Sequence, residues 1–244
     1  MPMKLPRLPA GQGWRENNVQ DEMVELTRSN VGRKIFMALT GWMMILFVAV
    51  HLLGNTTVYS GWINAYADRL HAIPPLLWIY RLFLAAMVTV HIFFGIQLTL
   101  ENRRAKPASY AVKKHLRATF AGRTMIWSGT VIGSFLLFHL VHFTLQLIFP
   151  EHAASRNMDS AGRPDVLGMV IYSFQHLAVS CIYGIAVAAL FLHLSHGIES
   201  SFQSFGLQSD RTQPFMVRAG AAAATVVAGG YLSIPIAALL GILK

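Results

Sequence analysis

Four histidines lie inside long apolar stretches of the chain, one in each of the first four stretches: His51, His91, His139 and His193. An imidazole inside a bilayer costs free energy unless it is paired, bound to a metal or facing a cavity. Neutral imidazole is also the commonest metal ligand among side chains. Four such residues on four successive stretches therefore indicate a function, and we interpret them as the axial ligands of two haems.

The composition indicates an integral membrane protein. Charged residues make up 13% of the chain, about half their share in soluble domains, and the mean hydropathy is +0.47. Five apolar stretches (34–56, 76–100, 123–149, 168–194 and 215–240) can each cross about 30 Å of hydrocarbon as a helix. They lack the alternation of barrel strands. We therefore expect an all-α fold, with a five-helix transmembrane domain at 31–244 after a cytoplasmic extension at 1–30.

The distribution of lysine and arginine predicts the orientation of these helices. Fifteen of the 20 basic residues fall in the N-terminal segment and in the loops after the second and fourth stretches, and five fall on the other side. The side rich in lysine and arginine is normally cytoplasmic. We therefore expect a cytoplasmic N-terminus and an outer C-terminus. The formal charge of +9 is mostly explained by this asymmetry, and nothing indicates a nucleic-acid partner.

The depth of each histidine follows from its position along its stretch. His51 and His139 lie roughly 25 Å from the cytoplasmic edge of outward-running stretches, so they share an outer layer. Stretches two and four run inward, and His91 and His193 lie in their cytoplasmic halves, with His193 almost at the end of its stretch. Each layer offers the two facing imidazoles that a six-coordinate haem iron needs.

Other histidines leave part of this assignment open. His142 lies one turn beyond His139, and His196 lies one turn beyond His193, so either could replace its neighbour as a ligand. His176, in the outer half of the fourth stretch, could contact quinone or a haem propionate. Any single intramembrane histidine could instead be hydrogen-bonded to a neighbouring helix.

Short motifs around these histidines resemble those of a known family. The motifs are the run Ser29–Gly41, His51-Leu-Leu-Gly-Asn55, His91-Ile-Phe-Phe-Gly-Ile-Gln97, Phe138-His-Leu-Val-His-Phe143 and the run His193–Gln203. In order and spacing they resemble the di-haem cytochrome b subunit of succinate:quinone oxidoreductases. They resemble in particular the type with a single membrane anchor of five helices, which bacterial succinate dehydrogenases and quinol:fumarate reductases share.

The resemblance implies a membrane anchor and electron-transfer subunit of respiratory complex II in the bacterial cytoplasmic membrane. A flavoprotein subunit and an iron-sulfur subunit would lie on its cytoplasmic side, and succinate or fumarate chemistry would occur on the flavin, outside this chain. The cofactors implied are two haem b groups and a quinone, mostly menaquinone in this type. The ligands carried over are His51 with His139 and His91 with His193. The resemblance leaves open whether two such heterotrimers form a dimer.

Further residues are candidates for contacts with these cofactors. Cationic and hydroxyl side chains at the inner side could hold haem propionates, namely Ser29, Arg33, Lys34 and Arg123. Polar and aromatic residues after the first stretch could surround the quinone, or could form an interfacial belt: Asn55, Tyr59, Trp62, Tyr66 and Asp68.

Two other functions fit parts of the pattern. A cytochrome b of a hydrogenase or formate dehydrogenase also pairs histidines across a bundle, but its catalytic partner lies outside the membrane, against the basic inner face predicted here. A haem-free transporter would use the histidines as proton relays and would be expected to show inverted repeats or broken spans. We recognise no convincing internal repeat in the sequence.

Overall fold

The computed structural model describes residues 29–105 and 119–243. These residues form helices, and their one extended pairing is an isolated bridge between Met158 and Pro164. Within these residues, five helical spans are long and apolar enough to cross a membrane: α2 (Asn30–Thr56), α4 (Pro74–Arg104), α6 (Met125–His139) together with the helical turn that continues it to Thr144, α8 (Leu177–Ser204) and α9 (Gln213–Leu239). The prediction of an all-α chain with five such helices is confirmed. Most of the predicted extension at 1–30 lies outside the described residues.

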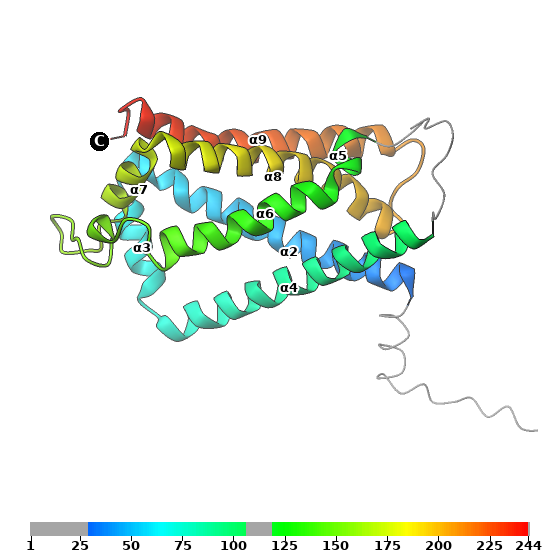
Figure 1. The fold of residues 1–244 in the computed structure, drawn as a ribbon, viewed down its shortest axis with the longest axis horizontal. Coiled ribbons are helices and arrows are strands. Elements are labelled where there is room, and N and C mark those ends of the chain that lie inside the picture. The colour runs from blue at the N-terminus through cyan, green and yellow to red at the C-terminus, as the bar shows by residue number, and fades with distance from the viewer. Residues whose placement is uncertain (1–28, 106–118, 244) are drawn as a thin grey trace, which may run out of the picture.

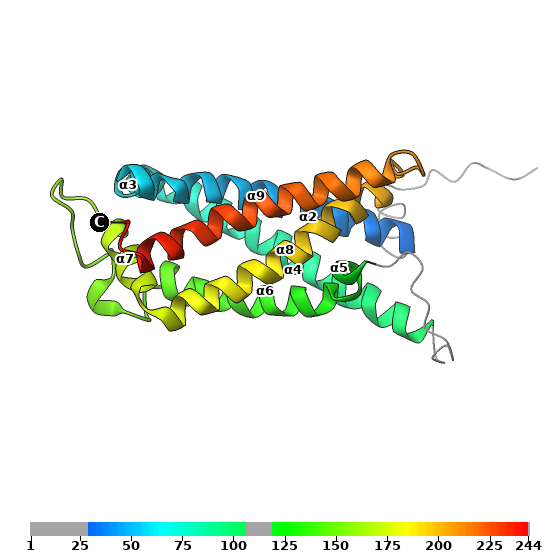
Figure 2. The ribbon, with the colours of Figure 1, turned by 90° about the horizontal axis from the view of Figure 1, so that it is seen from above.

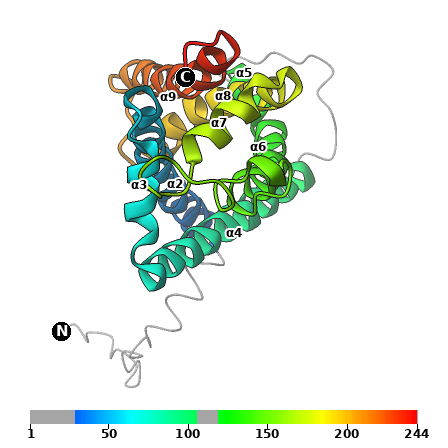
Figure 3. The same ribbon diagram turned by 90° about the vertical axis from the view of Figure 1, so that its left-hand side faces the viewer.

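Four of these helices form an antiparallel bundle, and the fifth packs outside it. Helices α2, α4, α6 and α8 alternate in direction along the long axis (Figure 1). Seen from the end, α2 and α6 occupy opposite corners, as do α4 and α8 (Figure 3). Helix α9 lies across α8 and α2 (Figure 2). A side chain on α2 therefore faces α6 only through the middle of the bundle.

Shorter elements close the two ends of the bundle. We call outer the end that carries η1 (Thr57–Ser60), α3 (Ile63–His71), η3 (Pro150–His152) and α7 (Val166–Gln175). The inner end carries α5 (Phe120–Arg123) and the start of α2. Buried Asn64 of α3 binds the carboxylates of Asp159 and Asp165 and accepts the Leu167 N–H, which ties α3 to the start of α7.

Polar contacts join neighbouring helices within the apolar bundle. Trp42 Nε1 donates to Ser201 Oγ at 2.9 Å, which links α2 to α8. The Tyr231 hydroxyl donates to the Val48 carbonyl at 2.7 Å, which links α9 to α2. Such bonds between membrane helices contribute about 0.6 kcal/mol each on average. They add to the packing that holds neighbouring helices together.

The fourth apolar stretch differs from its prediction. The run 168–194 contains two helices, α7 and α8, because His176 is extended (φ −82°, ψ 109°) and breaks the chain between them. Buried apolar residues flank the break on both sides, so hydropathy does not reveal it. Helix α8 also continues through a polar segment to Ser204. His193 therefore lies about three turns before the end of its helix, and the prediction that it lies almost at the end of its span is wrong.

The third stretch is shorter than its prediction as well. Helix α6 ends in a π-helical turn, η2 (Leu140–Thr144), and the chain then turns at Gln146, which has a φ of +56°. The predicted stretch continued to Phe149 because the residues after the turn remain apolar. A π turn inserted at the end of a helix is often found at a functional site.

The described basic residues separate between the two ends. Arg33, Lys34, Arg103, Arg104 and Arg123 lie at the inner end, where α2 begins and α4 ends. Arg69, Arg156 and Arg163 lie in the elements of the outer end. The helix directions thus match those assumed in counting the charges. Which end faces the cytoplasm stays a prediction.

Candidate functional site

The four histidines of the first four apolar stretches meet as two pairs. The ring centroids of His51 on α2 and His139 on α6 lie 6.0 Å apart, and we call these two the outer pair. The ring centroids of His91 on α4 and His193 on α8 lie 6.2 Å apart, and these form the inner pair. Each pair joins helices at opposite corners of the bundle (Figure 3). The structure thus brings together the residues that the sequence placed in one layer.

The separation within each pair fits a metal ion held by both imidazoles. A bond of about 2 Å on each side, and about 1 Å more from each nitrogen to its ring centre, gives centroids about 6 Å apart. The four histidines are also only partly buried, although they face one another inside a bundle. Both observations are compatible with a group placed between the rings.

The two pairs lie at different depths. A Cβ atom on Gly41 of α2 would lie 3.5 Å from His91 Cε1, and one on Gly129 of α6 would lie 3.4 Å from His193 Cε1. His51 and His139 each follow those glycines by ten residues on the same helix. Ten helical residues rise about 15 Å. The pairs are therefore separated by about 15 Å along the bundle, with the outer pair toward η1 and α7.

Both imidazoles of the inner pair are held by a neighbouring helix, His91 by α2 and His193 by α6. His91 Nδ1 lies 3.2 Å from the Met37 carbonyl oxygen and 3.2 Å from Thr40 Oγ1. His193 Nδ1 lies 3.2 Å from Ser128 Oγ. An Nδ1–H that donates to a carbonyl fixes the tautomer in which Nε2 is free to bind a metal. This arrangement of hydrogen bonds is typical of metal-binding histidines.

The outer pair is held on one side only. His139 Nδ1 lies 3.1 Å from the Tyr183 hydroxyl of α8. Among the described residues, the His51 ring has no hydrogen-bond partner, and it packs against Phe47, with ring centroids 5.2 Å apart, and against Tyr231, at 6.2 Å. The two imidazoles of this pair therefore have different surroundings.

The two alternative histidines face elsewhere. His142 uses both ring nitrogens, with Nδ1 3.1 Å from the Tyr183 hydroxyl and Nε2 3.1 Å from Ser173 Oγ, and it is buried. It could bind a metal only after losing one of these bonds. His196 lies against Gly122 of α5, and its Nδ1 is buried without a hydrogen bond, 3.7 Å from the Glu199 carboxylate. His139 and His193 are thus the members of their motifs that face another histidine.

The predicted propionate and quinone residues lie near the two ends. Ser29 caps α2 by accepting the Gly32 N–H at 3.0 Å, and Arg33 is buried in an ion pair with Glu101 of α4. Lys34 and Arg123 are exposed at the inner end. His176 is exposed at the outer end, where it stacks on Phe149 with ring centroids 4.7 Å apart. The described contacts of Lys34, Arg123 and His176 do not include the histidine pairs.

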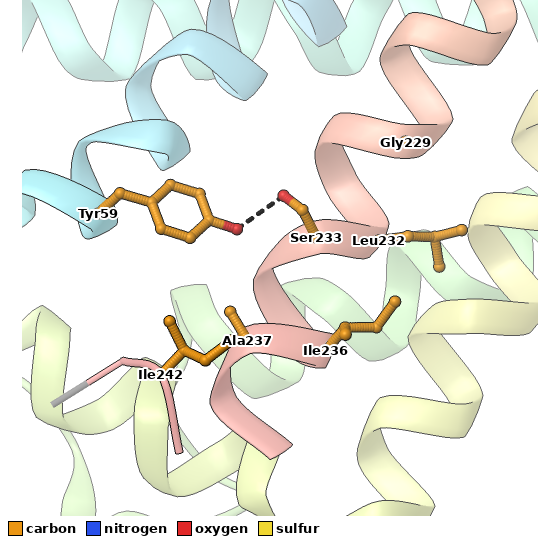
Figure 4. A pocket seen from close by; sticks show the side chains of 7 residues that line it. All are labelled: Tyr59, Gly229, Leu232, Ser233, Ile236, Ala237 and Ile242. Atoms are coloured by element: carbon orange, nitrogen blue, oxygen red, sulfur yellow. Dashed lines mark hydrogen bonds between the residues drawn. The ribbon is translucent and has the colours of Figure 1, made fainter. Parts of the chain in front are cut away.

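An apolar groove of about 570 Å³ lies at the outer end of the bundle (Figure 4). It lies between η1 and α9, and its two hydroxyls, of Tyr59 and Ser233, bond to each other at 2.7 Å. The neighbouring Gly230 packs directly against Leu52, the residue after His51. Of the residues predicted to surround the quinone, Tyr59 lines this groove. Tyr66 packs against Gly54 and Asn55 donates to the His51 carbonyl.

A repeated pattern in α2 and α6 was missed in the sequence. Met37-x-x-Thr-Gly-x5-Phe-x3-His51 matches Met125-x-x-Ser-Gly-x5-Phe-x3-His139 position by position. Each copy supplies one outer histidine, and its Thr or Ser contacts an inner one. The two helices run in the same direction (Figure 1), so the repeat is parallel and lacks the inverted relation expected of the transporter alternative. The sequence contained this signal as five positions at the same spacing in both copies, four of them with identical residues.

A similar cap precedes both copies of this pattern. Ser29 and Thr119 each accept the N–H of a glycine three residues later, Gly32 and Gly122, at 3.0 and 3.1 Å, and an arginine follows each glycine.

Comparison of the chain with protein-family models, curated proteins and solved structures finds no match. The histidine pairs and their repeated framework therefore carry the functional argument.

Proposed function

We propose that the chain is the membrane anchor and electron-transfer subunit of a succinate:quinone oxidoreductase, with two b haems held by the outer and inner histidine pairs. The observation that supports this most directly is the pairing itself. Two sets of imidazoles lie across opposite corners of one bundle, each with ring centroids about 6 Å apart. The resemblance of the motifs indicates the kind of complex to which such a bundle would belong.

The residues of the chain then act chiefly by holding and shielding the cofactors. His51 and His139 would bind one haem iron, and His91 and His193 would bind the other, so the haems would carry electrons and would not bind oxygen. The haems, when bound, supply one-electron transfer between the two ends of the bundle. The inner pair is held by Met37, Thr40 and Ser128, which prevents the imidazoles from turning away.

The distribution of charge supports an orientation for this transfer. Basic residues gather at the inner end, which would face the cytoplasm of a bacterial cell and receive the iron-sulfur and flavoprotein subunits. In this arrangement the N-terminus is cytoplasmic and the C-terminus lies outside. The flavin, and with it succinate or fumarate, belongs to the partner subunit.

The groove between η1 and α9 is our candidate for the quinone site. Its lining is mostly apolar, as a prenylated ring requires. The Tyr59 hydroxyl, which donates to Ser233 Oγ in this structure, would donate to a quinone oxygen in its place. Gly230 and Tyr231 connect this part of α9 to Leu52 and His51 of the outer pair. Menaquinone is the species that the family resemblance favours.

The proposal is tested by the haem content of the purified chain. A pyridine haemochrome assay and a reduced-minus-oxidised spectrum should show two low-spin b haems for each chain. His139→Asn should then remove one haem, whereas His142→Asn should keep both, because only His139 faces His51. A purified chain without haem would overturn the proposal, and loss of haem in His142→Asn alone would overturn the ligand assignment.

The quinone assignment has a separate test. Gly229→Phe places a ring inside the groove and should slow the reduction of a menaquinone analogue at least tenfold in the assembled complex, with both haems retained. Val226→Phe, on an exposed position of the same helix that does not line the groove, is the matched control. Equal rates in the two variants would place the quinone elsewhere.

A further inference from the structure

A buried chain of hydrogen-bonding groups leads away from the outer pair. The Tyr183 hydroxyl lies 3.1 Å from His139 Nδ1 and 3.1 Å from His142 Nδ1, and His142 Nε2 lies 3.1 Å from Ser173 Oγ. Tyr183, His142 and Ser173 are 8%, 3% and 1% exposed. The chain crosses from α6 to α8, returns to η2 and ends on α7. Water has almost no access to it, so these groups must satisfy one another.

The hydroxyl of Tyr183 has only one hydrogen for its two ring-nitrogen neighbours. It can donate that hydrogen to one Nδ1 and must then accept a hydrogen from the other. One of His139 and His142 therefore carries its proton on Nδ1 and the other does not. In the absence of a ligand on either ring, both directions of the chain satisfy the same contacts.

Binding of iron to His139 would remove this ambiguity. A neutral imidazole that binds metal through Nε2 keeps its proton on Nδ1, so His139 becomes the donor and Tyr183 the acceptor. Tyr183 must then donate to His142 Nδ1. His142 in turn carries its proton on Nε2 and donates to Ser173 Oγ. Every bond of the chain then has a single direction.

We propose that Tyr183 is a positioning residue of the outer haem, which fixes the tautomer of His139 and sets the reduction potential of the iron. This inference rests on the proposed function. A ligand whose Nδ1–H donates to an acceptor is more basic and stabilises the oxidised iron. His51, the other ligand of the outer pair, has no such partner among the described residues, so Tyr183 supplies this effect from one side. His142 and Ser173 keep the hydroxyl turned so that its oxygen faces His139.

The test is a redox titration of both haems in the full chain carrying Tyr183→Phe. Loss of the acceptor should shift the equilibrium of the outer haem about tenfold toward the reduced state, which is about 59 mV for a one-electron couple. The inner haem should keep its potential. Tyr231→Phe is the matched control, because its hydroxyl is bonded to the Val48 carbonyl and to no ring nitrogen, although its ring lies beside His51.

A second variant keeps the test decisive. Ser173→Ala leaves Tyr183 in place and removes the last acceptor of the chain, so it should shift the outer haem in the same direction by a smaller factor. Selective loss of the outer haem in Tyr183→Phe would also support the positioning role. An unchanged outer potential, or equal changes in both haems, would overturn it. A wild-type chain without haem would instead overturn the proposed function itself.

Discussion

The inner and outer pairs share one geometry but differ in what holds them. The ring centroids are 6.2 Å apart in the inner pair and 6.0 Å apart in the outer pair. Both inner imidazoles are bonded to groups of a neighbouring helix, and His91 is bonded to a backbone carbonyl. The outer pair has one bonded imidazole, and its partner is a hydroxyl shared with another histidine. The inner site is thus fixed in part by the backbone, at His91, whereas the outer site is held only by side chains that a single substitution can remove.

The largest effect expected is the loss of one haem without the other. His193→Ala should remove only the inner haem, and His51→Ala should remove only the outer one. The pairs lie about 15 Å apart and share no ligand, so their losses should be independent. Haem content and the α-band of the reduced spectrum would measure this. Loss of both haems in either variant would mean that the two sites form one cooperative unit.

A bulky side chain beside the inner pair should have the next largest effect. At Gly129 even a Cβ atom would touch His193, so Gly129→Leu should displace the imidazole and remove most of the inner haem. Thr130→Leu places the same side chain on the exposed side of α6 and should leave both haems in place. The haem content of the two purified variants is the measurement. Equal haem content would contradict the close approach of α6 and α8 at this level.

Removal of one hydroxyl from the inner pair should have a smaller effect. Thr40→Val leaves the Met37 carbonyl as a partner of His91 Nδ1, so the tautomer is kept. We expect a shift of less than threefold in the reduction equilibrium of the inner haem, smaller than that from Tyr183→Phe at the outer haem. Redox titration of both variants would compare them. A larger shift in Thr40→Val than in Tyr183→Phe would contradict the inference that the outer site depends more on a single side chain.

The smallest effect concerns the loop that closes the outer end. Hydrogen bonds from the Arg163 side chain and backbone lower the pKa of Asp159 to about 2, and Asp159 binds Asn64 beside the start of α7. Since this pKa is below its unfolded value of about 3.9, the stabilisation is present above about pH 4 and is lost as the pH falls toward 2. Asp159→Asn at neutral pH should reproduce the loss.

Limited proteolysis of residues 145–165 would detect that change. Cleavage should be faster in Asp159→Asn than in the wild type at pH 7, and the difference should disappear near pH 2. The inner haem should be unaffected, since the loop lies at the other end of the bundle. Resistance equal to that of the wild type at pH 7 would show that Asn64 and Asp165 hold the loop without Asp159.

The sequence by itself determined the class of fold and the residues that pair. Long apolar stretches must be helices, because the backbone has no other partner inside hydrocarbon. Counting residues at 1.5 Å each put His51 with His139 and His91 with His193, and the structure brings these rings together. Counting residues was enough to pair the histidines, because depth in the membrane is proportional to residue number along a straight helix.

Only the tertiary structure decided what surrounds each histidine. The choice between His139 and His142, one turn apart, depends on Tyr183 and Ser173, which come from two other helices. The break at His176 and the π turn at 140–144 left the apolar pattern continuous, so hydropathy could not locate them. Hydrogen bonds between distant segments depend on the rotation of each helix about its axis. That rotation is set by packing against neighbours, which no single stretch of sequence contains.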